Sequence, residues 1–288
     1  MISRRSALAM MAAPLLARCS LGSPAIRVAS KNFTESFVIA EIYAQALEAA
    51  GLRVERLFNL GSTQIAMAAM RRGNIDLYPE YTGTALIDVL HLPPIADSRA
   101  AYDTVSRLFK ERYGLIWLTP APMNDSQALA TTRSIAASKR LATLSDVARA
   151  SPQLRFATIQ EFLARPDGLP GLQRFYGGFR FAEIRTYDIA LKYRALLEGR
   201  ADVASAFSTD GEIASDSLVV LRDDRQFWSA YNVAPVVRGA ALDRWPQIPR
   251  VLDPVSRRIT DRAAQTMNAA VEKDQADPAD VAAEFLKR

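Results

Sequence analysis

The chain is organised around one stretch, Tyr78-Pro79-Glu80-Tyr81-Thr82-Gly83-Thr84. A short apolar run, Ile75 to Leu77, precedes it and is typical of a buried strand, and its last three residues stand where a following helix would begin. We therefore expect two tyrosines, two hydroxyls and a carboxylate at the carboxyl end of a strand, where open α/β sheets bind ligands. Tyr-Pro and Thr-Gly are also ordinary turn sequences, so a plain turn stays open at this point.

A second strand end repeats this pattern. The glycine of Gly73-x-x-Asp76-Leu77 precedes Tyr81 by eight positions. The glycine of Gly199-x-x-Asp202-Val203 precedes Phe207 by the same eight positions. In both places a helix-like segment ends at the glycine, a short strand follows, and small polar residues come after the aromatic residue. The repetition predicts two lobes that each present an aromatic side chain to one cleft.

The first 22 residues have the composition of an export signal. Arg4 and Arg5 precede an uncharged, mostly apolar run from Ala7 to Ala17, which is too short to span a bilayer. We expect residues 1–22 to be a signal peptide that sends the protein to the periplasm. The pair of arginines is compatible with twin-arginine export and is also common in ordinary secretory signals, so the route stays open.

Cys19 is the one cysteine of the sequence. The residues before it are similar to a lipoprotein cleavage box, but Arg18 stands where a small residue is expected, so lipid attachment remains an alternative to plain cleavage. With no other cysteine, the folded part is expected to contain neither disulfides nor thiolate metal sites.

Charge and hydropathy exclude further classes of protein. The leader holds three of the 36 basic residues and none of the 31 acidic ones, so the mature chain carries a net charge of about +2. This balance argues against a nucleic-acid partner. Apolar residues make up 49% of the chain, and no second long apolar segment follows the leader. We expect a soluble protein large enough for two lobes with separate cores.

Strand-like and helix-like segments alternate from Ile26 onward. Asn32 and Glu35 have the spacing of a capping box, and the helix that they would open ends at Gly51. In the next helix, Ile65 is expected to face the sheet. This alternation predicts a βαβαβ unit and a parallel sheet, with strands at 26–29, 54–58 and 75–77.

The alternation breaks twice, near residues 119–126 and 227–236, where proline-containing segments predict crossings between lobes. We expect residues 26–122 and 233–288 to form lobe 1 and residues 123–232 to form lobe 2, with the C-terminal helices returning to lobe 1.

Motifs along the whole mature chain resemble one family, the substrate-binding proteins of ABC importers for osmoprotectants such as glycine betaine, choline and carnitine. They are Ser30-Lys31-Asn32-Phe33-Thr34-Glu35, Glu41-Ile42-Tyr43-Ala44-Gln45-Ala46-Leu47-Glu48, Asn59-Leu60-Gly61-Ser62-Thr63-Gln64, Tyr78 to Thr84, Pro120-Ala121-Pro122-Met123-Asn124, Ser208-Thr209-Asp210-Gly211 and Tyr231-Asn232-Val233-Ala234-Pro235.

The resemblance implies an α/β fold of the type II periplasmic-binding-protein class, with two lobes and two hinge crossings. It also implies a monomeric, exported protein that captures a small quaternary ammonium or zwitterion, without cofactor or metal, and delivers it to an ABC permease in the inner membrane.

The same resemblance implies the ligand-binding residues. Tyr81 and Tyr231 would be rings of a cage around the quaternary ammonium, with Thr84 as a polar neighbour. A ring face attracts a desolvated cation by about 0.5 to 2 kcal/mol per contact. Arg165 would grip a carboxylate of the ligand through paired hydrogen bonds, and Lys31 is a further anchor.

Two positions depart from the family pattern. Gln127 and Phe207 both stand where the family has tyrosine. Phenylalanine keeps the ring face, whereas glutamine loses it. The alternative is therefore the same transport role for a different small solute, such as an amino acid derivative, that Gln127 would hydrogen-bond.

Other roles for these residues, and other classes of protein, stay open. Tyr81 and Phe207 could be core residues, Tyr231 could pack at the hinge, and Arg165 could lie on a solvated loop. An enzyme could use Glu80 and Asp210 as an acid/base pair. The sequence contains none of the hydrolase, zinc-protease, phosphate-loop or dinucleotide signatures, which argues against catalysis. A ligand-sensing domain of a regulator or receptor could share this fold, but the export leader argues against it.

Overall fold

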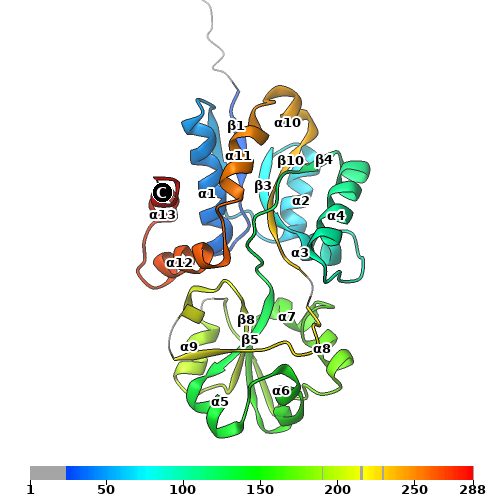
Figure 1. Ribbon diagram of the computed structural model, residues 1–288, viewed down its shortest axis with the longest axis vertical. Coiled ribbons are helices and arrows are strands. Elements are labelled where there is room, and N and C mark those ends of the chain that lie inside the picture. Colours follow the sequence, from blue (N-terminus) through cyan, green and yellow to red (C-terminus); the bar gives the residue numbers. More distant parts are fainter. Residues whose placement is uncertain (1–23, 190, 215–216, 229, 288) are drawn as a thin grey trace, which may run out of the picture.

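The structure of the protein is a computed structural model that describes residues 24–189, 191–214, 217–228 and 230–287. The expected leader and Cys19 lie outside the described residues. The described chain forms two α/β lobes, one above the other in Figure 1. Within this part of the chain, no helix combines the length and apolar character needed to cross a membrane.

The first lobe is built on a five-stranded mixed sheet. Strands β2, β1 and β3 run parallel, as the predicted βαβαβ unit requires. β10 lies antiparallel to its neighbours β3 and β4, so it runs opposite to the other four strands, because it enters from the returning crossing. The strands, in spatial order, are β2 (Val54–Leu57), β1 (Ile26–Ala29), β3 (Leu77–Tyr81), β10 (Val233–Arg238) and β4 (Leu115–Trp117).

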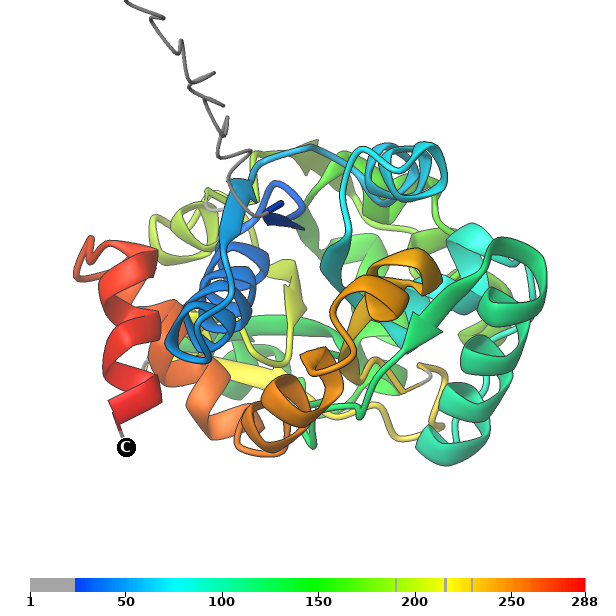
Figure 2. The same cartoon turned by 90° about the horizontal axis from the view of Figure 1, so that it is seen from above.

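The helices of the first lobe enclose one continuous apolar core. The C-terminal helices α11, α12 and α13 pack against α1, and Figure 2 shows the red α13 beside the blue α1. The helices are α1 (Thr34–Ala49), α2 (Thr63–Arg72), α3 (Thr82–Thr84), the π-helix η1 (Ala85–Val89), α4 (Ser98–Tyr113), α10 (Gly239–Arg244), α11 (Ile248–Ser256), α12 (Asp261–Glu272) and α13 (Pro278–Lys287).

Strand β3 begins two residues later than predicted and contains the first four residues of the organising stretch. Pro79 stands in the strand directly opposite Pro235 of β10. Three residues after Pro79, Thr82 N donates to Asn232 O. Hydrogen-bonded and non-hydrogen-bonded pairs alternate along an antiparallel ladder. The two prolines therefore occupy a non-hydrogen-bonded pair, and neither interrupts the β3–β10 ladder.

Two local predictions in this lobe are wrong. Helix α1 begins after Phe33, and no side chain caps it, so the predicted capping box of Asn32 and Glu35 does not form. The Glu35 side chain is buried and is used elsewhere. In α2 the buried side chains are Thr63, Ala66, Met67 and Met70, whereas Ile65 is 52% exposed, because the face toward the sheet lies one residue further along the helix.

The second lobe repeats the strand order of the first. β6 runs parallel to β7 and β8, and β5 runs antiparallel to β8 and β9. Its apolar residues form two separate clusters. The spatial order is β7 (Glu183–Thr186), β6 (Arg155–Thr158), β8 (Val203–Phe207), β5 (Gln127–Thr132) and β9 (Leu218–Leu221). The helices are α5 (Arg133–Lys139), α6 (Leu144–Ala150), the 3-10 helix η2 (Ser151–Gln153), α7 (Gln160–Ala164), α8 (Leu169–Tyr176), α9 (Lys192–Leu197) and the 3-10 helix η3 (Gly211–Ala214).

The repeated Gly-x-x-Asp pattern corresponds to the same contact in both lobes. Asp76 precedes β3, and its Oδ2 accepts from the backbone N–H of Arg27 at 3.0 Å and from the Arg27 Nε at 2.9 Å. Asp202 precedes β8, and its Oδ2 accepts from the backbone N–H and the Nε of Arg155 at 2.8 and 3.1 Å. Each aspartate thus ties the start of one strand to the start of its parallel neighbour.

The two crossings between the lobes are joined to each other. Asn124 and Asn232 form an isolated antiparallel bridge, and the Asn124 side chain accepts from the backbone N–H of Tyr231 at 2.7 Å. The side-chain amide of Asn232 donates to Met123 O at 2.9 Å. The crossings therefore form a narrow, hydrogen-bonded waist between the sheets.

Candidate functional site

The end of β3 holds a buried ammonium against an aromatic ring. Lys31 Nζ lies 4.7 Å from the centroid of the Tyr81 ring and 5.5 Å from that of Phe33. It also forms a 2.7 Å ion pair with Glu80, and both side chains are almost completely buried. The face of the Tyr81 ring therefore lies close to a positive charge of the protein itself.

The hydroxyl of Tyr81 belongs to a chain of hydrogen bonds between the lobes. It donates to Glu35 Oε1 at 2.6 Å, and Asn268 Nδ2 donates to Glu35 Oε2 at 3.0 Å. Asn268, on α12, also donates to Thr209 O of the second lobe at 2.8 Å. Burial and the adjacent Glu35 carboxylate raise the pKa of Tyr81 well above its ordinary value, so the phenol stays protonated as the donor.

Carboxylates gather where the lobes meet. Asp125, in the crossing, accepts from the Thr209 hydroxyl at 2.6 Å. Burial and the charge of Glu35 raise the pKa of Asp125 well above its ordinary range. Burial raises the pKa of Glu35 as well. On α12, burial and then the charge of Glu212 raise the pKa of Glu272 to about 8. The junction therefore favours protons or other positive charge.

The end of β8 repeats the arrangement seen at β3. Lys192 Nζ lies 5.0 Å from the Phe207 ring centroid and 4.8 Å from that of Tyr193, and it pairs with Asp210 at 2.9 Å. Asp210 also accepts from the Phe207 backbone N–H at 3.0 Å and the Tyr193 hydroxyl at 2.5 Å. Each lobe thus brings a lysine, a carboxylate and an aromatic ring to its strand end.

Arg165 already binds two carboxylates of the protein. Its Nε and Nη2 donate to the two oxygens of Asp167 at 2.8 and 2.7 Å, and its Nη1 donates to Asp88 in the first lobe. Tyr231 donates its hydroxyl to Asp167. Burial by itself would lower the pKa of the guanidinium, but its bonds to Asp167 outweigh this and raise the pKa above the ordinary value.

Tyr231 lies against helix α3 of the first lobe. A Cβ at Gly83 would overlap the Tyr231 ring, so the glycine allows the ring to approach this closely. Tyr231 is 3% exposed and belongs to the core of the first lobe. Thr84 is buried at the end of the same short helix.

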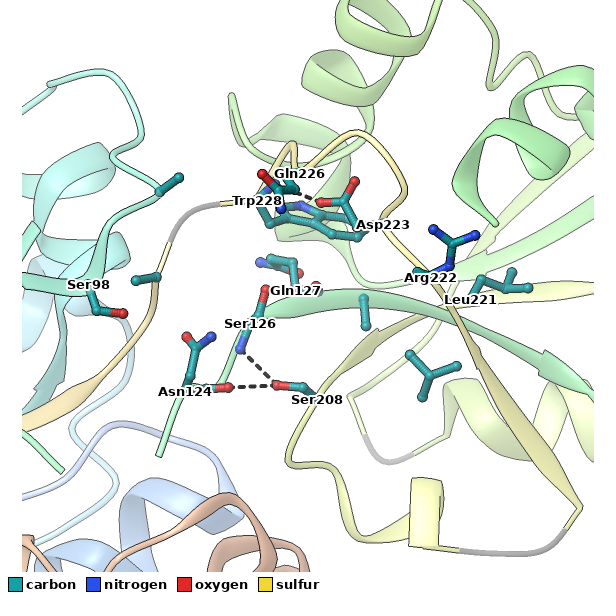
Figure 3. Close-up of a pocket in the computed structure, with 14 residues that line it drawn as sticks. Ser98, Asn124, Ser126, Gln127, Ser208, Leu221, Arg222, Asp223, Gln226 and Trp228 are labelled. Atoms are coloured by element: carbon teal, nitrogen blue, oxygen red, sulfur yellow. Dashed lines mark hydrogen bonds between the residues drawn. The ribbon is translucent and has the colours of Figure 1, made fainter. Parts of the chain in front are cut away.

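Gln127 lines a cavity of about 430 Å³ that takes residues from both lobes. It is paired with Phe207 in the ladder between β5 and β8 and is 7% exposed. Figure 3 shows its side chain between Ser126 and Trp228. Gln127 alone among the seven predicted site residues lines this cavity, whose labelled wall residues are Ser98, Asn124, Ser126, Ser208, Leu221, Arg222, Asp223, Gln226 and Trp228.

The structure thus gathers six of the seven predicted residues into three pairs. Lys31 contacts the Tyr81 ring, while Arg165 and Tyr231 meet on the carboxylate of Asp167. Gln127 and Phe207 are neighbours on paired strands.

Several polar groups of the site were missed by the sequence argument. Lys192 carries no motif signal, but Asp210 stands in the quoted Ser-Thr-Asp-Gly motif, and the repeated strand pattern could have indicated a cation near Phe207. Asp167 lies two residues after Arg165, where local pairing is common. Asp88 reaches Arg165 across 77 positions of sequence, so local sequence gave no signal for it.

Comparison with known proteins identifies the family. Residues 24–288 match the family described as the substrate binding domain of ABC-type glycine betaine transport systems. The chain is 36% identical to a glycine-betaine-binding protein of Pseudomonas aeruginosa, over 91% of this chain and 87% of that protein. It is 29% identical to a combined ergothioneine transport permease and binding protein of Helicobacter pylori, over 95% of this chain and about half (49%) of that longer protein.

A solved structure agrees with these relatives. The crystal structure of a glycine betaine/carnitine/choline ABC transporter protein superposes with a TM-score of 0.79 at 29% identity, covering 91% of this chain and 97% of that one. The two lobes, the two crossings and the strand order fit the type II periplasmic-binding-protein fold that the sequence predicted. The chain belongs to the family of substrate-binding proteins of ABC-type glycine betaine transport systems, which are transport proteins and not enzymes.

Proposed function

We propose that this protein captures a small quaternary ammonium or zwitterion of the glycine betaine or choline type between its lobes and delivers it to an ABC permease. The observation that carries the proposal is a pair of aromatic rings, Tyr81 from one lobe and Phe207 from the other. Each ring already lies within 5.0 Å of a lysine ammonium of the protein. A quaternary ammonium has no N–H to donate, so ring faces and nearby carboxylates are the groups that can hold it. Thr84, Tyr231, Arg165 and Lys31 complete the proposed site.

The proposed mechanism is closure of the lobes around the solute. Residues 26–122 and 233–288 would move as one lobe and residues 123–232 as the other, bending at the hydrogen-bonded waist. A solute that contacts rings from both lobes binds the closed form better than the open one and therefore shifts the population toward closure. The closed form would then dock on the permease as a monomer.

The proposed location is the periplasm, as for binding proteins that supply an importer. Residues 1–22 would direct export and be removed, with attachment of a lipid at Cys19 as the alternative to plain cleavage. Mass spectrometry of the protein recovered from the periplasmic fraction would show the mature N-terminus, and recovery of the full-length chain from the cytoplasm would contradict export.

Titration calorimetry of the mature chain tests the proposed function. Glycine betaine, choline and carnitine are the expected ligands, with ectoine and common amino acids as comparison solutes. We expect saturable binding of at least one trimethylammonium compound, with compaction in solution scattering when that solute is added. Binding of an amino acid with no response to any quaternary ammonium would contradict the osmoprotectant assignment, and binding without compaction would contradict closure.

The cavity beside Gln127 favours a second candidate, import of a solute that carries its own N–H or hydroxyl groups. Its walls include the amides of Asn124 and Gln127 and the hydroxyls of Ser126 and Ser208, which can donate and accept hydrogen bonds. The relative from Helicobacter pylori is named for ergothioneine, so solutes differ among similar proteins.

The substitution Gln127→Tyr separates the two candidates. If the solute is a quaternary ammonium, the added ring should tighten its binding by about fivefold, the effect of roughly 1 kcal/mol. Phe207→Tyr is the matched control, because a ring face is already present there. If the solute is hydrogen-bonded by Gln127, the substitution should abolish its binding and bring no gain for betaine or choline.

A further inference from the structure

The guanidinium of Arg165 is shared between the two lobes. All three of its nitrogens are engaged: Nε and Nη2 with Asp167, and Nη1 with Asp88. Arg165 and Asp167 lie in the loop after α7 of the second lobe, whereas Asp88 lies in the π-helix η1 of the first. A carboxylate of the protein therefore stands where a carboxylate of a bound solute would have to sit.

The two aspartates are held very differently. Asp167 is 2% exposed, its carboxylate also accepts from Tyr231, and its backbone carbonyl accepts from the Trp228 indole at 2.9 Å. The Asp88 side chain is 16% exposed, and Arg165 is its hydrogen-bond partner among the described residues. Asp88 is therefore the partner that a competing anion can displace.

Burial and the neighbouring carboxylates disfavour the ionised form of Asp88, the form that pairs with Arg165. Burial raises the pKa of its carboxyl, and the neighbouring carboxylates of Asp167 and Glu80 add to the rise, while the cations Arg165 and Lys31 oppose it. An ionised Asp88 thus sits among like charges and depends on Arg165 for compensation. Asp88 binds Nη1, the one guanidinium nitrogen that Asp167 does not bind, so withdrawal of Asp88 opens this nitrogen to another carboxylate.

We propose that Asp88 is a specificity-determining residue that competes with the carboxylate of a bound solute for Arg165. The inference rests on the proposed function, because it concerns the choice among its solutes. A solute with a carboxylate, such as glycine betaine, must displace Asp88 to reach the guanidinium and then replaces it as the link between the lobes. A solute without one, such as choline, leaves the Arg165–Asp88 pair in place. Asp88 therefore disfavours betaine-type solutes relative to choline.

Choline and glycine betaine form a matched pair for the test, since they share a trimethylammonium group and differ in a hydroxymethyl group against a carboxylate. Both are titrated calorimetrically into the mature wild-type chain and into Asp88→Asn. We expect Asp88→Asn to tighten glycine betaine by at least about fivefold and to leave choline unchanged or slightly weaker. Asp103→Asn removes the same charge from the exposed face of α4 in the same lobe and should change neither affinity.

A second variant guards against a folding defect. Asp88→Ser also removes the carboxylate while leaving a small polar group, and thermal melting shows which of the two variants is folded. An unchanged ratio of the two affinities in a folded variant, or equal changes for both solutes, overturns the role of Asp88. Failure of both solutes to bind any of the proteins, wild type included, overturns the proposed function and this inference together.

Discussion

The two lobes share a scaffold and differ in how they use it. Both sheets have the same strand order and pairing directions, both tie an aspartate to an arginine at the start of the parallel pair, and both place a lysine over an aromatic ring at the strand end. The ring is a tyrosine in the first lobe and a phenylalanine in the second. Among the shared features, the ring and the carboxylate at each strand end are groups that attract a cation.

The differences concern what surrounds the rings. The Tyr81 hydroxyl joins Glu35 and Asn268 in the hydrogen bonds that reach the second lobe, whereas Phe207 has no hydroxyl and its neighbour Tyr193 bonds Asp210 instead. The first lobe has one continuous core, reinforced by the C-terminal helices, and the second has two smaller clusters. The first lobe thus has the larger and more continuous core.

The largest effect that this comparison predicts concerns the two aspartate ties. Asp76 is bound by Arg27 and also by Arg238, whereas Asp202 is bound by Arg155. Asp76→Ala should lower the free energy of unfolding by about 3–5 kcal/mol, because it leaves a buried backbone N–H and two guanidinium groups without their acceptor. Asp202→Ala should cost about 2–3 kcal/mol, since its partner is more exposed. Urea unfolding measures both.

Asp103→Ala, on the exposed face of α4, is the control for the loss of a carboxylate and should stay within about 0.5 kcal/mol of wild type. If Asp202→Ala costs as much as Asp76→Ala, the ties are equivalent and the extra bond from Arg238 contributes nothing.

The next largest effect is expected at Gly211, the glycine that follows the Phe207 ring in the second lobe. A Cβ at Gly211 would lie 2.5 Å from the backbone nitrogen of Ala269 on α12, in the other lobe. Gly211→Ala should therefore force η3 and α12 apart, at a cost of about 1–3 kcal/mol to the contact between lobes. Solution scattering should show a more open protein. Gly177→Ala is the matched control, because a Cβ there meets nothing within 4 Å, although its positive φ carries a backbone cost.

A smaller, pH-dependent effect is expected where α12 meets η3. The pKa of Glu272 is about 8 against an ordinary 4.5, so the folded protein holds this proton more tightly than the unfolded chain does. Its contribution to stability is complete below pH 4.5 and is lost as the pH rises toward about 8. We expect unfolding free energy to fall by on the order of 1–2 kcal/mol between pH 6 and pH 8.

Glu272→Gln should flatten this dependence without removing it, because burial also raises the pKa values of Glu35 and Asp125. Glu284→Gln, on the exposed part of α13, is the control and should keep the wild-type slope. A Glu272→Gln variant with that same slope would mean that Glu272 does not keep its proton in the folded state.

The sequence predicted the architecture because the periodicity of apolar residues and the residues that end helices and strands are local features. Gly73 ends α2 in the left-handed conformation, and a short strand, β8, follows Gly199 as the repeated pattern predicted. The capping box at Asn32 and Glu35 failed for the opposite reason: a tertiary partner, Tyr81, takes the Glu35 carboxylate away from the helix end. The helical face of Ile65 was misplaced by one residue, because a short helix with many alanines leaves its rotation poorly determined.

The candidate site was predictable only in part. Family motifs gave Tyr81, Phe207, Tyr231 and Arg165, and their role as ligand-binding residues stays a prediction. The ion pairs that occupy them could not be predicted, since Lys31 meets Glu80 and Arg165 meets Asp88 through the fold rather than through spacing. The carboxylates at the junction of the lobes could not be predicted either, because Glu35, Asp125 and Glu272 are far apart in the sequence.

The central claim is that a ring at the strand end binds a positive charge on the solute. The most direct measurement compares choline with its neutral analogue, in which a quaternary carbon replaces the nitrogen, by calorimetric titration into wild type, Tyr81→Leu and the control Tyr113→Leu, whose ring also faces a cation but lies on α4. We predict that wild type and Tyr113→Leu bind choline about tenfold more tightly than the analogue and that Tyr81→Leu loses most of this preference. Equal affinity of the wild-type protein for the charged and the neutral compound would contradict the account.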